Sequence, residues 1–206
     1  MKPSENVGRV FLIRHAESVR NAAKRLIKIK KGGPNEPESE ALKAAHHILS
    51  QPNCGSPLTD VGKMSQRLAV QNISARLLER GNSVQIVTSP YERCYSTAKM
   101  LNIELARHGL EAKFKVDQEV GEAKIRGVSG RLRQALADSS RGDDVVILSH
   151  SGALRRGLFL KGHGWISKSI PNAAVIMLFM DGNAVNQTQD LSSHNVTPDD
   201  QLESVI

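Results

Sequence analysis

The chain carries near its start the run Val10-Phe11-Leu12-Ile13-Arg14-His15-Ala16-Glu17-Ser18-Val19-Arg20-Asn21. Its apolar beginning predicts a buried β-strand over residues 10–13, and a helical pattern follows over about 18–31 with Ser18 as the N-cap. Arg14 and His15 stand where this strand ends, and ligands of open parallel sheets bind at the carboxyl ends of the strands. The pair offers a fixed cation beside an imidazole that can act as nucleophile, base or metal ligand. Taken alone, it fits a surface arginine and a half-buried histidine equally well.

Strands and helices alternate along the rest of the sequence. Strands are expected over 10–13, 84–88, 113–116 and 145–148, and a terminal hairpin over 174–180 and 184–188. Helices are expected over about 18–31, 38–49, 60–80, 90–108 and 131–140, and from residue 152 to 160, with a glycine-containing loop over 118–130. This order predicts an α/β fold, a three-layer α/β/α sandwich with a mostly parallel central sheet. We expect one domain over residues 1–206, with a loosely held polar tail from about residue 190.

Composition narrows the class of ligand. The 28 Lys and Arg against 21 Asp and Glu leave a net charge of +7, which favours anionic ligands. Aromatic residues make up 3% of the chain, too few for the stacking platforms of single-stranded nucleic-acid binders, so no nucleic-acid partner is expected. Cys54 and Cys94 lack metal-ligand spacing and are expected to be reduced thiols. No signal-peptide core and no membrane-spanning run is present, so we expect a cytoplasmic protein without membrane, metal or cofactor.

Two further strand ends carry polar side chains. Thr88-Ser89 leads to Arg93, and the fourth strand runs into Ser149-His150. Because parallel strands end at one edge of a sheet, Arg14, His15, Arg93 and His150 are expected to converge there. Two arginines and two histidines would form a pocket for a dianion, most naturally a phosphoryl group. The N-termini of the following helices would add backbone N–H donors.

Four motifs in order resemble the histidine phosphatase superfamily, the phosphoglycerate-mutase-like proteins. The first strand of that family ends in Arg-His-Gly-Glu-Thr with an Asn three residues on, which resembles Arg14-His15-Ala16-Glu17-Ser18 with Asn21. The later motifs Leu-Thr-x-x-Gly, Ser-Pro-x-x-Arg-x-x-x-Thr-Ala and Ser-His-Gly-Gly resemble 58–62, 89–98 and 149–152, and Pro171-Asn172-Ala173 resembles the usual entry to the terminal strand. Each motif is weak alone, but together they span residues 10 to 180 and are specific.

The resemblance implies a phosphatase mechanism with a covalent intermediate. His15 would attack phosphorus in line to give phosphohistidine. The phosphoryl oxygens would be held by Arg14, Arg93, a protonated His150, Asn21 and Ser151. The expected substrate is a phosphorylated small molecule or a phosphoprotein.

A carboxylic acid must protonate the leaving oxygen and then activate water. In the family this acid is a Glu followed by a glycine-rich stretch that ends in Glu-Gly. Glu122 lies eight residues before Gly130, as that pattern requires, although Ser129 stands where the second Glu is usual. Glu119 is the other candidate. The hypothesis takes Glu122 as the acid.

Other departures leave the substrate and the fate of the phosphoryl group open. Ala16 and Ser151 replace usual glycines, so the backbone there must lie in an ordinary region or be strained. The segment 22–57 is an insertion relative to small family members, in which such segments tend to set substrate choice. A phosphatase is favoured over a phosphoglycerate-type mutase, and a phosphate- or phosphopeptide-binding module without an effective acid is the alternative from another class. A serine-hydrolase elbow at 149–152 is disfavoured because the first glycine of Gly-x-Ser-x-Gly is missing.

The end of the first predicted helix is strongly basic, with Lys24-Arg25, Lys28 and Lys30-Lys31. Cations at a helix C-terminus are favoured by the macrodipole, so a solvated helix end is the preferred interpretation. The alternative is contact with a second phosphate or with an acidic phosphoprotein beside the pocket.

Overall fold

A single six-stranded sheet organises the protein. The computed structural model describes residues 8–29, 39–122, 125–159, 170–181 and 184–190. The strands are β1 (Arg9–Arg14), β2 (Val84–Thr88), β3 (Ala112–Val116), β4 (Asp144–Ser149), β5 (Val175–Asp181) and β6 (Ala184–Asp190), in the order β3-β2-β4-β1-β5-β6. The first four are parallel, whereas β5 runs antiparallel to β1 and to β6. This arrangement confirms the predicted mostly parallel sheet.

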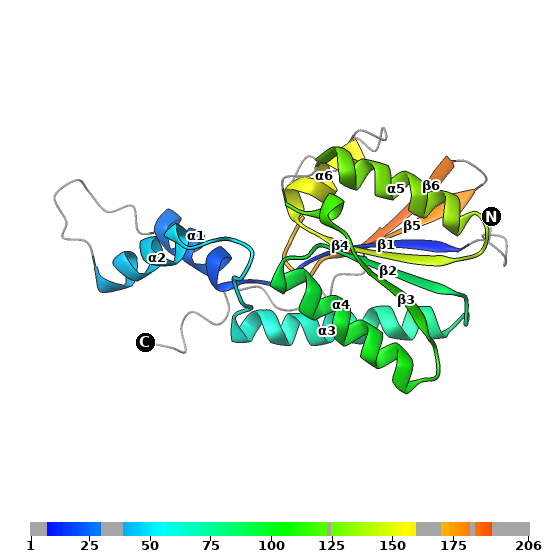
Figure 1. The fold of residues 1–206 in the computed structure, drawn as a ribbon, viewed down its shortest axis with the longest axis horizontal. Helices are drawn as coiled ribbons and strands as arrows, with labels where there is room; N and C mark the ends of the chain where they lie inside the picture. Colours follow the sequence, from blue (N-terminus) through cyan, green and yellow to red (C-terminus); the bar gives the residue numbers. More distant parts are fainter. Residues whose placement is uncertain (1–7, 30–38, 123–124, 160–169, 182–183, 191–206) are drawn as a thin grey trace.

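Helices cover both faces of the sheet (Figure 1). On one face lie α3 (Asp60–Leu78) and α4 (Glu92–Arg107), and on the other lie α5 (Ile125–Ser139) and α6 (Ser151–Phe159). β1 shows why: Phe11 and Ile13 belong to the core under α3 and α4, while Val10 and Leu12 belong to the core under α5 and α6. Successive side chains of a strand point to opposite faces, so a strand buried on both sides reads as a continuous apolar run. The three-layer sandwich is confirmed.

A hairpin of two helices projects beyond the carboxyl ends of the strands (Figure 1). It consists of α1 (Val19–Ile29) and α2 (Glu40–Ser50), which correspond to the helices predicted over 18–31 and 38–49. A backbone bridge between Ser18 and Leu58 closes its base, where the N–H of Val19 also donates to the carbonyl of Pro57 at 2.9 Å. Lys30, Lys31 and the predicted polar tail beyond residue 190 lie outside the described residues.

Side-chain capping explains where several helices begin. Ser18 Oγ accepts from the N–H of Asn21, so the expected cap of the first helix is present, and Thr59 Oγ1 accepts from the N–H of Gly62 at the start of α3. Gly62 is required for a different reason: a Cβ there would lie 2.1 Å from the carbonyl oxygen of Glu17. The Leu-Thr-x-x-Gly motif therefore fixes the base of the hairpin against the strand end that carries Arg14.

The loop predicted over 118–130 is wrong in part. Residues Gln118–Val120 form a short 3₁₀ helix, η1, and α5 begins at Ile125 rather than at about 131. Gly127 falls within the loop predicted over 118–130, but it lies in α5 and lets this helix pack closely on η1. A Cβ at this position would lie 2.2 Å from the carbonyl oxygen of Glu119. Gly81 and Gly109 follow α3 and α4 with left-handed backbone, at φ of +62° and +77°, as is usual for the glycine that ends a helix.

The start of the sheet is tied down by a buried ion pair. Arg9 donates through Nη2 to Asp144 Oδ2 at 2.6 Å and through its backbone N–H to Oδ1 at 2.7 Å. The two side chains are 6% and 0% exposed. Because the partners sit on the neighbouring strands β1 and β4, they hold the register that places the strand ends. No helix in the described part of the chain is long and apolar enough to span a membrane.

Candidate active site

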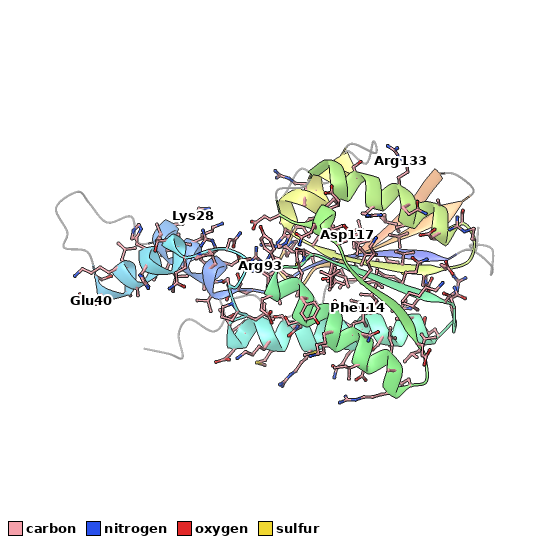
Figure 2. All side chains as sticks on the ribbon, viewed as in Figure 1. Lys28, Glu40, Arg93, Phe114, Asp117 and Arg133 are labelled. Atoms are coloured by element: carbon pink, nitrogen blue, oxygen red, sulfur yellow. The ribbon has the colours of Figure 1, made fainter. Side chains whose placement is uncertain are left out.

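The three polar strand ends do meet at one edge. β4 lies between β1 and β2, with Arg14 opposite Ser149 and Thr88 opposite Leu148. The side chains that follow these strands are therefore neighbours across the sheet. Figure 2 shows Arg93 at this edge, where the α1–α2 hairpin meets the sheet.

His15 is held as a neutral imidazole with a lone pair on Nε2. Its Nδ1 lies 2.7 Å from the carbonyl oxygen of Ala16, which can only accept, so Nδ1 carries the proton. Nε2 then accepts from Nε of Arg93 at 3.2 Å. Burial, with smaller contributions from the neighbouring His150 and Arg93, holds the pKa of His15 well below its usual value. The side chain is therefore an uncharged nucleophile near pH 7.

His150 lies against the ring of His15, with centroids 5.1 Å apart in an edge-on arrangement. Its Nδ1 is 3.3 Å from Arg93 Nη2 and its Nε2 is 3.0 Å from Ser89 Oγ. Burial and then the charges of Arg93 and Arg14 lower the pKa of His150 to about 3. His150 is thus neutral near pH 7, whereas the family resemblance implies a protonated one. A phosphoryl dianion would oppose the two arginine charges and favour protonation.

Arg93 joins all parts of the site. It is 2% exposed, and besides His15 it donates to the carbonyl of Asn53 at 2.8 Å and to Glu122 Oε2 at 2.8 Å. The ring of Tyr91 packs on its guanidinium, 4.9 Å from Cζ to the centroid. A fixed, desolvated guanidinium of this kind is the side chain suited to grip a phosphoryl group.

The guanidinium of Arg14 has a buried donor without a partner among the described residues. Its Nη1 donates to the carbonyl of Ile170, but its Nε is buried without a hydrogen-bond partner among the described residues. Burial lowers the pKa of Arg14 to about 10, so it stays charged at neutral pH. Ser151 Oγ accepts from the N–H of Ile170 at 3.2 Å, so its contact in this structure supports the carbonyl that positions Arg14.

The two candidate acids have different surroundings. Glu122 lies on Arg93 and also accepts from the side-chain amide of Asn53, with its side chain 39% exposed. Glu119 instead packs against α5, because a Cβ on Gly127 would lie 2.6 Å from its Oε2. Of the two, Glu122 is the one in contact with the site.

Asn53 is the residue that the sequence does not single out. It lies in the loop between α2 and α3, and it contacts Arg93 through its carbonyl and Glu122 through its amide. The only signal available was its position shortly before the Leu-Thr-x-x-Gly motif, which points to no chemistry.

Asn21 reaches the turn before β5. Its Nδ2 donates to Asn172 Oδ1 at 3.2 Å, and the N–H of the next residue, Ala173, donates to the carbonyl of His15 at 3.2 Å. Ala173 has a φ of +57°, the only left-handed non-glycine residue among those described. Ala16 and Ser151 thus replace glycines without left-handed backbone.

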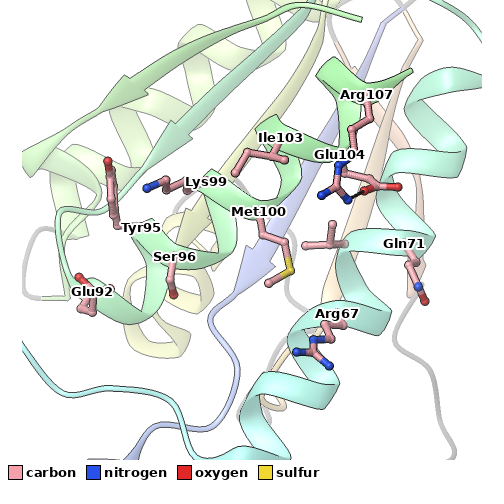
Figure 3. A pocket seen from close by; sticks show the side chains of 11 residues that line it. Arg67, Gln71, Glu92, Tyr95, Ser96, Lys99, Met100, Ile103, Glu104 and Arg107 are labelled. Atoms are coloured by element: carbon pink, nitrogen blue, oxygen red, sulfur yellow. Dashed lines mark hydrogen bonds and ion pairs between the residues drawn. The ribbon is translucent and has the colours of Figure 1, made fainter. Parts of the chain in front are cut away.

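A separate groove lies outside this site, on the outer surface between α3 and α4 (Figure 3). It has a volume of about 550 Å³, and residues such as Arg67, Lys99 and Met100 line it. None of the predicted site residues lines it.

Comparison with known proteins supports the fold at low sequence identity. No family model and no curated protein sequence matches the chain. The fold is similar to that of a phosphoglycerate mutase from Bacillus anthracis (TM-score 0.56, 10% identity, 91% of this chain and 93% of that one). It is also similar to that of a mycobacterial glucosyl-3-phosphoglycerate phosphatase solved with VO3 (TM-score 0.51, 15% identity, 89% of this chain and 97% of that one). A third similar structure is an Agrobacterium tumefaciens protein assigned as the phosphohistidine phosphatase SixA (TM-score 0.55, 15% identity, 89% of this chain and 97% of that one). The chain therefore has the α/β fold that these phosphatases and the mutase share.

Proposed function

We propose that this protein is a histidine phosphatase, which transfers the phosphoryl group of a phosphomonoester to His15 and then to water. The observation that carries the proposal is the state of His15: Nδ1–H is bound to the Ala16 carbonyl, and the lone pair on Nε2 faces the guanidinium of Arg93. A nucleophile and an anion-binding group thus share one point at the edge of the sheet. The substrate is a phosphorylated small molecule or a phosphoprotein.

In the first step, the Nε2 lone pair of His15 attacks phosphorus and the bond from phosphorus to the leaving oxygen breaks. Arg93 and the free Nε of Arg14 hold the phosphoryl oxygens, and the dianion draws a proton onto His150. Once the phosphoryl group has displaced it from Arg93, the Glu122 carboxylate takes up a proton from solvent and gives that proton to the leaving oxygen, so the alcohol departs neutral.

In the second step, the carboxylate of Glu122 removes a proton from water. The water oxygen attacks phosphorus, and the bond from phosphorus to Nε2 breaks. Inorganic phosphate leaves, His15 returns to its neutral state and Glu122 is again protonated. Because Glu122 pairs with Arg93 before substrate arrives, the incoming phosphoryl group must displace this carboxylate from the guanidinium.

Trapping the intermediate tests the proposal. A labelled aryl phosphate, quenched within milliseconds, should leave acid-labile phosphate on His15, and His15→Ala should abolish both the label and the turnover. Glu122→Gln should slow hydrolysis of an alkyl phosphate by about 10²–10⁴-fold, and Glu119→Gln serves as its matched control. Label on another residue, or full activity in His15→Ala, would rule the mechanism out.

A mutase is the second candidate, because the fold resembles a phosphoglycerate mutase as closely as a phosphatase. Phosphate release from an aryl phosphate, measured beside the conversion of 3- to 2-phosphoglycerate, separates the two. Strong interconversion with negligible release would favour the mutase. Phosphate binding without turnover in either assay would favour a binding module.

A further inference from the structure

Helix α1 has two distinct faces. Its apolar side includes the buried Ala23 and packs on α2, as the spacing of the apolar residues requires. The opposite side carries Asn21, Lys24 and Lys28, which are separated by three and four residues and therefore share one face. Asn21 contacts Asn172 in the turn that abuts His15, so this face begins at the candidate active site.

Some positively charged side chains of this hairpin have a hydrogen-bond or ion-pair partner within the protein, and others do not. Arg20 donates to the carbonyls that end α2, Arg25 pairs with Glu17 at 2.5 Å, and Lys43 pairs with Glu40 at 2.8 Å. Lys24 and Lys28, both exposed, make no ion pair or hydrogen bond with any residue that the structure describes.

No acidic residue occurs within α1. The two free charges therefore repel each other across one turn of a helix without local compensation.

We propose that Lys24 and Lys28 form a subsite for a second anionic group of the phosphorylated substrate, a step that rests on the proposed phosphatase function. A helix rises 1.5 Å per residue, so Lys24 and Lys28 stand roughly 5 and 10 Å beyond Asn21 along α1. Figure 2 shows Lys28 out on the hairpin and Arg93 at its base. The resemblance implies that Asn21 holds the phosphoryl group, so this geometry favours substrates whose second charge lies roughly 5–10 Å from that group.

Two kinds of substrate carry such a charge. In an extended peptide, an acidic side chain two or three residues from the phosphorylated one lies roughly 7–10 Å away. A small bisphosphate presents a second phosphate at a similar distance. Both supply the same chemistry to the two lysines, and the experiment distinguishes them.

The test compares Lys24→Gln/Lys28→Gln with the control Lys99→Gln/Lys113→Gln, which removes the same charge from α4 and β3. The probes are 4-nitrophenyl phosphate, a phosphoserine peptide with Asp two and three residues away, the same peptide with Asn at those positions, and a butanediol bisphosphate. The ratio of kcat/KM for the Asp peptide or the bisphosphate to that for 4-nitrophenyl phosphate should fall about threefold to tenfold in the α1 variant. It should not fall in the control, and the loss should shrink in 0.5 M salt.

Binding to the His15→Ala background separates this proposal from the proposed function. There the Kd of a fluorescent Asp peptide or of the bisphosphate should weaken by the same factor when the lysines are replaced, even if the intact protein turns over nothing. A loss confined to the peptide or to the bisphosphate supports the subsite and identifies the source of its anion. Equal losses for all four probes, equal losses in the control, or no loss at all would overturn the proposal.

Discussion

Replacing Asn53 with alanine tests the least expected contact in the site. The change removes the amide that donates to Glu122 Oε2 but keeps the carbonyl that accepts from Arg93. A hydrogen bond to a charged group contributes about 1.5–3 kcal/mol. Because the Glu122 side chain is 39% exposed, water replaces part of that bond, which leaves about 1–2 kcal/mol. We therefore expect kcat/KM to fall roughly fivefold to thirtyfold.

The assay uses two leaving groups. If Asn53 positions the proton donor, the loss should be larger for an alkyl phosphate, whose alkoxide needs the proton, than for 4-nitrophenyl phosphate. Gln51→Ala is the matched control, because that neighbouring amide contacts only His47 among the contacts described for its side chain. A loss that is the same for both substrates, or no larger than that of Gln51→Ala, would refute the positioning role.

Three further predictions concern pH, thiol chemistry and stability. The lowered pKa of His150 means that the folded protein binds fewer protons than the unfolded chain below pH 6.5, so stability should be lost as pH falls from 6.5 towards 3. His15 acts in the same direction, so in urea titrations at several pH values His150→Gln should reduce the slope of the unfolding free energy by up to about 1.4 kcal/mol per pH unit, and an unchanged slope would contradict this. Burial raises the pKa of the Cys94 thiol to about 12, whereas Cys54 is exposed. A thiol reagent should therefore label Cys54 in the native protein and Cys94 only after unfolding, and rapid labelling of native Cys54→Ser would contradict this prediction. Asp144→Ala should lower the free energy of unfolding in urea by about 3–5 kcal/mol, because the buried Arg9 loses its ion-pair partner. A loss below about 1 kcal/mol would be inconsistent with the buried pair.

The sequence predicts the centre of the sheet well because β1 and β4 are buried on both faces. Val10 to Ile13 reads as a strand without any tertiary information, and the polar residues that follow it mark the end at which ligands bind. Because parallel strands end at one edge, the sequence predicts that Arg14, His15, Arg93 and His150 converge there. Contacts link His15, Arg93 and His150, and, besides burial, the charge of Arg14 lowers the pKa of both histidines. Their roles in catalysis stay predictions.

What the sequence misses depends on contacts between distant segments. Gly127 resembles a loop glycine, yet it lies in α5, where the carbonyl of Glu119 leaves no room for a Cβ. Asn53 acquires its importance only where the α2–α3 loop folds back onto Arg93. The neutral state of His150 follows from burial beside two arginines, a property of the assembled pocket that no local pattern encodes.

The bridge at the base of the α1–α2 hairpin has a consequence for how the protein loses activity on heating. Beyond Ser18 and Leu58, the hairpin packs mainly on itself, and such units open locally at lower free energy than the sheet. Asn21 and Asn53 both belong to the chain that leaves and returns through this narrow base. Opening of the hairpin therefore withdraws two site residues while the sheet stays folded. Catalysis will fail at a temperature below the melting of the core, and amide exchange will be fastest in the hairpin.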